Sequence, residues 1–186
     1  RVSNPNRQAL ENVITALEYG EDSCAFSSGN TAGMAVFQAL KPGSHIICPD
    51  DMYWGFKKQL QSIFADSLTF DFIDLTAIDN IASYINSNTA LIWVETPSNP
   101  LLKITVLVAI AQIAKQHQLI FACDSTFASP ILQNPILLGA DIVMHSTTKY
   151  IGGHSDVLGG SLTTAKKSGF WEKIKNVQQI GGAVSS

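Results

Sequence analysis

The sequence has little charge and no excess of basic residues. Only 15% of its 186 residues are Asp, Glu, Lys or Arg, whereas 46% are hydrophobic. This composition excludes a disordered chain and predicts one globular domain with a packed core. Twelve Lys and Arg against fifteen Asp and Glu give a net charge of -3, with no basic stripe that could neutralise a phosphate backbone. Nucleic acid is therefore not an expected partner.

Long hydrophobic runs are also missing. The most apolar stretch, residues 106–114, is interrupted by Gln112 and followed by Lys115. It is shorter than the roughly 20 residues that a membrane span needs, so no membrane segment is expected. No secretory signal is visible either, although a chain that begins at Arg1 without a methionine could have lost one.

The sequence has few cysteines, and their number and spacing do not indicate disulfide bonds. Cys24, Cys48 and Cys123 are an odd number, lie in apolar runs and show no Cys-x-x-Cys spacing. We expect them to be small buried side chains in a protein of a reducing compartment, the cytoplasm, and we expect no metal site.

Short apolar runs alternate with segments of helical period along the chain. This alternation is typical of an α/β fold with a mostly parallel sheet. The runs ALIWV and LIFAC are apolar at every position, which predicts a sheet covered by helices on both faces. Strands are expected at 24–26, 45–48, 68–73, 90–95, 119–123 and 141–145, and helices at 31–40, 54–65, 76–86 and 105–117.

Polar residues collect where these strands end, which is where ligands bind in open parallel sheets. The first such group is SSGNT at 27–31, directly before an expected helix. Small residues and free N–H groups at a helix start suit a phosphate. The alternative is that Asn30 or Thr31 only caps the helix. The spacings of a P-loop and of a dinucleotide fingerprint are absent, which disfavours nucleotides.

Two further strand ends carry reactive groups. Asp124 follows the strand at 119–123, and Ser146, Thr148 and Lys149 follow the strand at 141–145. Asp124 could instead cap the next turn, and Lys149 could be a surface residue. Together with the 27–31 segment, however, these residues suit a phosphorylated aldehyde with a basic ring nitrogen, which describes pyridoxal phosphate. The lysine would bind the aldehyde and the aspartate would hold the ring nitrogen protonated.

The chain resembles the Cys/Met metabolism pyridoxal-phosphate enzymes. The resemblance extends over nearly all of the sequence, and the lysine followed by GHSD is its most specific part. It implies the large domain of a fold-type I pyridoxal-phosphate enzyme over residues 1–186. The motifs that carry it are RVSNP at 1–5, LEYG at 17–20, SSG at 27–29, ETPSNP at 95–100, DSTF at 124–127, HSTTKY at 145–150 and GHSD at 153–156.

The resemblance also assigns roles to individual residues. The catalytic residues would be Lys149, Tyr53 and Asp124, with Tyr53 stacked on the ring. The cofactor-binding set would comprise these three with Arg1, Gly29, Asn30, Asn99, Thr126, Ser146 and Thr148. Gly29 and Asn30 would bind the phosphate through backbone amides, and Asn99 would lie near the ring hydroxyl. Trp54 replaces a common glycine, and we expect it to pack in its helix rather than to reshape the substrate pocket.

Arg1 matches an arginine that family members extend to the phosphate of a neighbouring subunit. If residues 8–17 form a helix that leads away from the site, a partner's pocket is its more plausible target. We therefore expect a homodimer or homotetramer. A frayed, solvated terminus is the alternative. Relatives continue into a smaller carboxy-terminal domain that grips the substrate carboxylate, and we expect this domain to be absent from the chain.

The resemblance implies an enzyme of sulfur amino-acid metabolism that acts on a small amino-acid substrate. The first expectation is cystathionine gamma-synthase activity, in which cysteine replaces the γ-substituent of an acylated homoserine. The alternatives are cystathionine or methionine gamma-lyase and cystathionine beta-lyase. A protein of another class, a cofactor-binding fragment without catalysis, also remains open. The sequence does not distinguish synthase from lyase.

Overall fold

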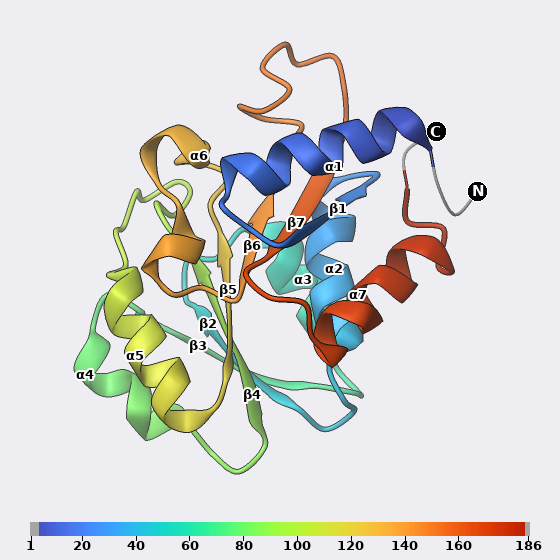
Figure 1. Cartoon of the computed structure of the whole chain (residues 1–186). Coiled ribbons are helices and arrows are strands. Elements are labelled where there is room, and N and C mark those ends of the chain that lie inside the picture. Colours follow the sequence, from blue (N-terminus) through green and yellow to red (C-terminus); the bar gives the residue numbers. More distant parts are fainter. Residues whose placement is uncertain (1–3, 185–186) are drawn as a thin grey trace.

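A seven-stranded, mostly parallel sheet forms the centre of the protein (Figure 1). The computed structural model describes residues 4–184. Five neighbouring strands are parallel, and one strand is antiparallel to both of its neighbours. In order across the sheet, the strands are β1 (Asp22–Phe26), β7 (Gly160–Thr164), β6 (Ile142–His145), β5 (Ile120–Asp124), β4 (Thr89–Glu95), β2 (His45–Pro49) and β3 (Thr69–Ile73).

Six of these strands coincide with the apolar runs of the sequence, so the predicted α/β class with a mostly parallel sheet is confirmed. The antiparallel strand β7 was not predicted. Its sequence, GSLTT, has one large apolar residue, and its buried Ser161, Thr163 and Thr164 do not mark a core strand. The buried hydroxyl groups of Ser23 and Thr163 form a hydrogen bond with each other, with 2.8 Å between the two oxygens.

The helices connect the strands and mostly begin within two residues of the predicted positions. The segment expected as one helix at 76–86 is instead a short α-helix followed by a 3-10 turn. The four-residue helix at 129–132 and the last helix were not predicted. The helices are α1 (Pro5–Leu17), α2 (Gly29–Ala39), α3 (Trp54–Ser62), α4 (Ile78–Ile81), α5 (Leu107–His117), α6 (Ser129–Leu132) and α7 (Gly169–Gln179), with 3-10 turns η1 (Ala82–Tyr84) and η2 (Pro135–Leu138).

Helices cover both faces of the sheet, as the continuous apolar strands predict. Alternate residues of one strand enter different cores: Leu91 and Trp93 belong to the core under α2, α3 and α7, whereas Ile92 and Val94 belong to the core under α4 and α5. Figure 1 shows α5 and α7 on opposite sides of the strands. No helix within residues 4–184 is long and apolar enough to cross a membrane.

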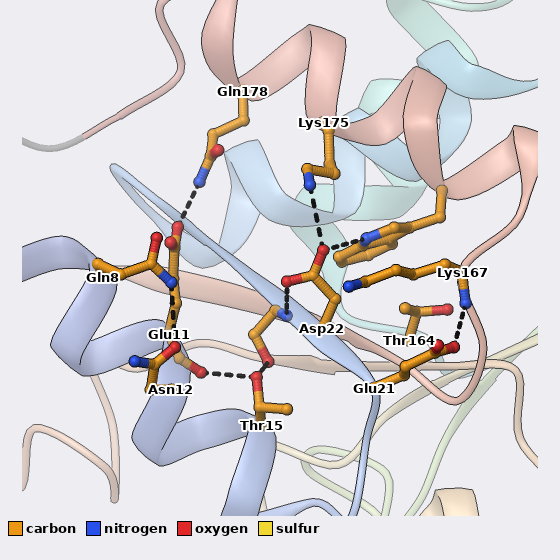
Figure 2. Close-up of polar contacts among 12 residues, drawn as sticks. Gln8, Glu11, Asn12, Thr15, Glu21, Asp22, Thr164, Lys167, Lys175 and Gln178 are labelled. Carbon is orange, nitrogen blue, oxygen red and sulfur yellow. Dashed lines mark hydrogen bonds and ion pairs between the residues drawn. The ribbon is translucent and has the colours of Figure 1, made fainter. Parts of the chain in front are cut away.

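Buried and partly buried polar contacts fix α1 and α7 to the edge strand β1 (Figure 2). The Glu11 carboxylate of α1 accepts a hydrogen bond from the Ala25 N–H of β1 at 2.9 Å and one from the Gln178 amide of α7 at 2.7 Å. The Asp22 carboxylate accepts bonds from the Trp171 indole and the Lys175 ammonium, both on α7. These contacts attach the first and last described helices to the same strand.

The topology brings several strand ends to one edge of the sheet. Because β7 is antiparallel to both β1 and β6, these two strands run in the same direction as β5, β4 and β2. Their carboxyl ends therefore lie at the same edge, where open parallel sheets bind ligands.

Candidate active site

A cavity of about 780 Å³ opens at this edge of the sheet. This volume is typical of sites for small molecules. Nine of the ten predicted site residues line it: Gly29, Asn30, Tyr53, Asn99, Asp124, Thr126, Ser146, Thr148 and Lys149. Arg1, the tenth, lies outside the residues that the structure describes. The residues that the sequence predicted separately thus border a single space.

The start of α2 supplies two free N–H groups to the cavity. Ser28 caps the helix: its hydroxyl oxygen accepts a hydrogen bond from Thr31 N–H at 3.1 Å, and its carbonyl accepts one from Ala32 N–H at 3.0 Å. The N–H groups of Gly29 and Asn30 precede these two and have no acceptor within the helix, so they are available to an anion. The alternative, in which Asn30 or Thr31 caps the helix, was wrong, because Ser28 fills that position and leaves Asn30 in the helix.

Gly29 allows this helix start to lie against the end of β6. A Cβ atom at Gly29 would lie 2.7 Å from Ser146 Cβ and 2.9 Å from Ser146 Oγ. Real Cβ atoms essentially never approach so closely. The missing side chain therefore keeps the amides of α2 and the Ser146 hydroxyl beside each other at the cavity wall.

Asp124 is the last residue of β5, and its carboxylate is buried. Its Oδ1 accepts a hydrogen bond from Thr126 N–H at 2.9 Å, and Thr126 Oγ1 in turn accepts one from Ser146 N–H at 2.8 Å. Asp124 thus caps the turn that follows it and also faces the cavity. Burial raises the pKa of Asp124, although hydrogen bonds from Thr126 oppose the change. A cation in the cavity would relieve this cost of burial.

Lys149 lies in the turn after β6, with its side chain at the cavity wall and its backbone held in place. Lys149 N–H donates to the Ser146 carbonyl at 3.0 Å, and Gly153 N–H donates to the Lys149 carbonyl at 2.8 Å. The neighbouring Thr148 hydroxyl donates to the Gly159 carbonyl at 3.1 Å and accepts from Gly159 N–H at 3.0 Å. Its single proton is therefore used inside the chain, and Ser146 is the better hydroxyl donor for a ligand.

Tyr53 and Asn99 border the cavity from two other loops. The Tyr53 ring packs edge-on against Phe56, with 5.5 Å between the ring centroids, and remains 41% exposed. Trp54, which we expected to pack in its helix, is 72% exposed at the first position of α3 and is not among the lining residues. The expectation was wrong because the helix buries Gly55, Phe56 and Leu60 instead.

Glu95 lines the cavity and was not among the predicted site residues. It is the last residue of β4, and its register partner in β5 is Asp124. Burial and the Asp124 charge raise the pKa of Glu95 to about 8, and hydrogen bonds from the N–H groups of Tyr53 and Asn99 partly oppose this rise. The rule that strand ends bear the functional groups would have found it, since Glu95 begins the ETPSNP motif.

The donor set of the cavity fits pyridoxal phosphate. Two free helix N–H groups and the Ser146 hydroxyl would hold the phosphate, and Tyr53 would cover the ring. The buried Asp124 carboxylate would pair with the protonated ring nitrogen, which also accounts for a carboxylate at so buried a position. Lys149 would bind the aldehyde carbon.

Comparison with known proteins points to the same cofactor. The chain is 46% identical to a probable cystathionine gamma-synthase of Herpetosiphon aurantiacus over 185 residues, which are 99% of this chain and 58% of that protein. It is 40% identical to a cystathionine beta-lyase of Coxiella burnetii over 188 residues, covering all of this chain and 49% of that protein. The chain therefore spans about half the length of the curated relatives it matches.

A solved structure has the same fold. The crystal structure of cystathionine gamma-lyase from Lactobacillus plantarum, complexed with L-serine, superposes with a TM-score of 0.95 and 40% identity, covering all of this chain and 49% of that one. Residues 1–186 also match, as a whole, the family described as Cys/Met metabolism PLP-dependent enzyme. The chain belongs to this family of pyridoxal-phosphate enzymes.

Proposed function

We propose that the intact protein containing this chain is a pyridoxal-phosphate enzyme of sulfur amino-acid metabolism, with cystathionine gamma-synthase as its activity. The observation that carries the proposal is the convergence of Lys149, Asp124 and the start of α2 on one cavity. Relatives named as gamma-synthase, gamma-lyase and beta-lyase, at 40–46% identity, support the broader class.

When bound, the cofactor supplies a sink for the electrons released at the α-carbon of an amino acid. Asp124 would hold a proton on the ring nitrogen, which keeps that sink effective. Lys149 Nζ would take the proton from the substrate α-carbon and return it at a later step. Proton transfer by a positioned side chain typically contributes about 10²–10⁴-fold to the rate. Tyr53 would hold the ring and assist proton removal from the incoming substrate amine.

The test compares Lys149→Ala with the unaltered protein. The unaltered protein should develop the visible absorption band of lysine-bound cofactor and turn over substrate. Lys149→Ala should lose both, while its circular dichroism stays unchanged because the side chain lies at the cavity wall outside the core. An unchanged band in the variant would contradict the assignment of Lys149.

The substrate is tested with the same protein. O-succinylhomoserine with cysteine should yield cystathionine if the activity is that of a synthase. Breakdown of cystathionine alone would instead support the gamma-lyase or beta-lyase activities named for the relatives. Cofactor binding without turnover of either substrate would favour a non-catalytic role.

We also propose that the protein is at least a homodimer and that Arg1 binds the phosphate in a neighbouring chain. Exposed apolar side chains support an interface: Ile131 and Leu132 of α6 are 84% and 81% exposed, and Leu101, Leu102 and Ile104 are also exposed. Sedimentation should show a dimer or tetramer, and Arg1→Ala should weaken cofactor binding. A monomer with unchanged affinity in the variant would refute this proposal.

The three buried, unpaired cysteines support a reducing compartment, and we propose the cytoplasm.

A further inference from the structure

Glu95 connects two loops that carry cofactor-facing residues. Its side chain is 7% exposed, and both of its carboxylate oxygens are occupied. Oε2 accepts a hydrogen bond from Tyr53 N–H at 2.6 Å, and Oε1 accepts one from Asn99 N–H at 3.2 Å. Tyr53 belongs to the connection between β2 and α3, and Asn99 to the connection between β4 and α5. One carboxylate therefore holds together two loops that face the same cavity, although Tyr53 and Asn99 lie 46 positions apart in the sequence.

A second contact joins the same two loops farther from the ring site. The Ser98 hydroxyl donates a hydrogen bond to the Asp51 carboxylate, and Ser98 Oγ accepts one from Lys103 N–H at 3.1 Å. Ser98 is buried, whereas the neighbouring ion pair between Lys103 and Asp50 is partly exposed at 3.1 Å and contributes little. We call Glu95 and Ser98, with their partners Tyr53, Asn99 and Asp51, the loop tie.

The carboxylate is an expensive way to join two N–H groups. Glu95 and Asp124 share a register in neighbouring strands, so their side chains leave the sheet on the same face. Two buried carboxylates on neighbouring strands disfavour each other's charge, and the charge on Asp51 adds to this effect. A ligand cation facing Asp124 would offset the repulsion. This cost points to a role for Glu95 with the ligand bound rather than to fold stability alone.

We propose that Glu95 is a positioning residue that, through the loop tie, holds Tyr53 and Asn99 in register against the cofactor ring. The inference rests on the proposed cofactor-binding function of the cavity. It adds a residue that contacts neither the phosphate cradle nor Lys149 in the structure but determines where two ring-contacting residues lie.

Two substitutions separate the geometry of Glu95 from its charge. Glu95→Gln keeps the length but offers only one acceptor oxygen, so one of the two N–H groups loses its partner. Glu95→Asp keeps the charge and both oxygens but is one methylene shorter and cannot reach both loops. We expect each variant to raise the cofactor dissociation constant about tenfold, measured by titrating the cofactor-free intact protein. A rise with Glu95→Gln alone would show that charge matters instead of position and would overturn the proposal.

Glu11 provides a matched control (Figure 2). It is also a glutamate with 7% exposure, and its Oε1 accepts hydrogen bonds from Ala25 N–H and the Gln178 amide, but it lies outside the cavity. Unlike Glu95, it also forms an ion pair, with Arg7 at 3.5 Å, which a glutamine would remove. Glu11→Gln should lower the unfolding midpoint and leave the cofactor dissociation constant unchanged. Near neutral pH, Glu95→Gln should instead raise the cofactor dissociation constant and leave the unfolding midpoint of the cofactor-free protein unchanged. The reason is that its amide resembles the carboxyl group of Glu95, which is protonated in the cofactor-free protein. An equal loss of affinity in both variants would reduce the role of Glu95 to general stability and overturn the proposal.

Ser98 keeps the proposal testable if the Glu95 variants fail to fold. Ser98→Ala removes the second contact of the loop tie, and Ser98→Thr retains a hydroxyl for Asp51. We expect a two- to threefold rise in the dissociation constant for the alanine variant, about 0.5 kcal/mol by the standard conversion, and recovery in the threonine variant. If the Glu95 variants fold, the inference is overturned when they and Ser98→Ala all bind the cofactor with wild-type affinity. If the Glu95 variants do not fold, wild-type affinity in Ser98→Ala alone overturns it. Failure of the unaltered protein to bind the cofactor would instead refute the proposed function.

Discussion

The close approach of Gly29 to Ser146 predicts that a single methyl group disrupts the phosphate cradle. In Gly29→Ala, the new Cβ would lie 2.7 Å from Ser146 Cβ and 3.0 Å from Ser146 Cα. Ordinary contacts begin at 3.4 Å, so the start of α2 and the end of β6 must separate by several tenths of an ångström. Overpacking of this kind typically costs about 1–3 kcal/mol. The shift would also move the Gly29 and Asn30 amides away from the Ser146 hydroxyl.

Gly169 isolates this effect from the intrinsic difference between glycine and alanine. Both glycines are the first residue of an eleven-residue helix, and both follow a serine cap, Ser28 or Ser168, that accepts a bond from the residue three positions on. Apart from its chain neighbours and the backbone of its own helix, a Cβ at Gly169 would have no atom within 4 Å. Gly169→Ala should therefore stabilise the protein by about 0.4–1 kcal/mol through the unfolded chain.

The assay compares thermal midpoints and cofactor affinity in the two variants. For a folded unit of about 150–250 residues, about 1 kcal/mol corresponds to roughly 2–4 °C. We expect Gly29→Ala to melt several degrees below Gly169→Ala and to bind the cofactor at least tenfold more weakly, while Gly169→Ala binds normally. If Gly29→Ala matched Gly169→Ala in both measurements, the packing argument would be refuted.

Two further predictions concern the carboxylates of the site. Asp124→Asn should retain the cofactor but lose most activity, because an amide does not hold the ring nitrogen protonated; near-normal turnover would contradict this role. The pKa of Glu95 is raised from 4.5 to about 8 in the folded, cofactor-free protein. Between these two pH values the folded protein keeps a proton on Glu95, whereas the unfolded chain has released it. Stability should therefore fall as the pH rises from about 5 through about 8. Denaturant midpoints of the cofactor-free protein at about pH 6 and about pH 9 test this, and Glu95→Gln should reduce the slope; a midpoint that rises with pH would refute the sign.

The sequence predicted the parallel part of the sheet because its central runs, ALIWV and LIFAC, are apolar at every position. Trp93 and Phe121, for example, lie in runs that only a strand covered on both faces accommodates. It did not predict β7, because Ser161 and Thr163 are buried by pairing with neighbouring strands rather than by their own hydrophobicity. Tertiary pairing of this kind has no local period to detect.

Most of the candidate site could be predicted because its residues follow strand ends or belong to family motifs. Glu95 also ends a strand and begins the ETPSNP motif, so its presence at the site could have been predicted. Its hydrogen bonds with the N–H groups of Tyr53 and Asn99 could not, because they join loops that are distant in the sequence. The exposure of Trp54 was missed for a related reason: a large aromatic residue in a helix is normally buried, and only the orientation of α3 shows which side faces the core.

The position of β7 between β1 and β6 has a consequence for synthesis. Ser23 and Thr163, which contact each other across β1 and β7, are separated by 140 residues. At about 5–20 residues per second, β1 would wait roughly 7–28 s after its own translation for the strand that joins it to the sheet. For most of that interval Lys149 itself has not been made, so the start of α2 and the lysine cannot yet border one cavity. The complete cavity can therefore form only late, when the nascent chain has passed Thr164.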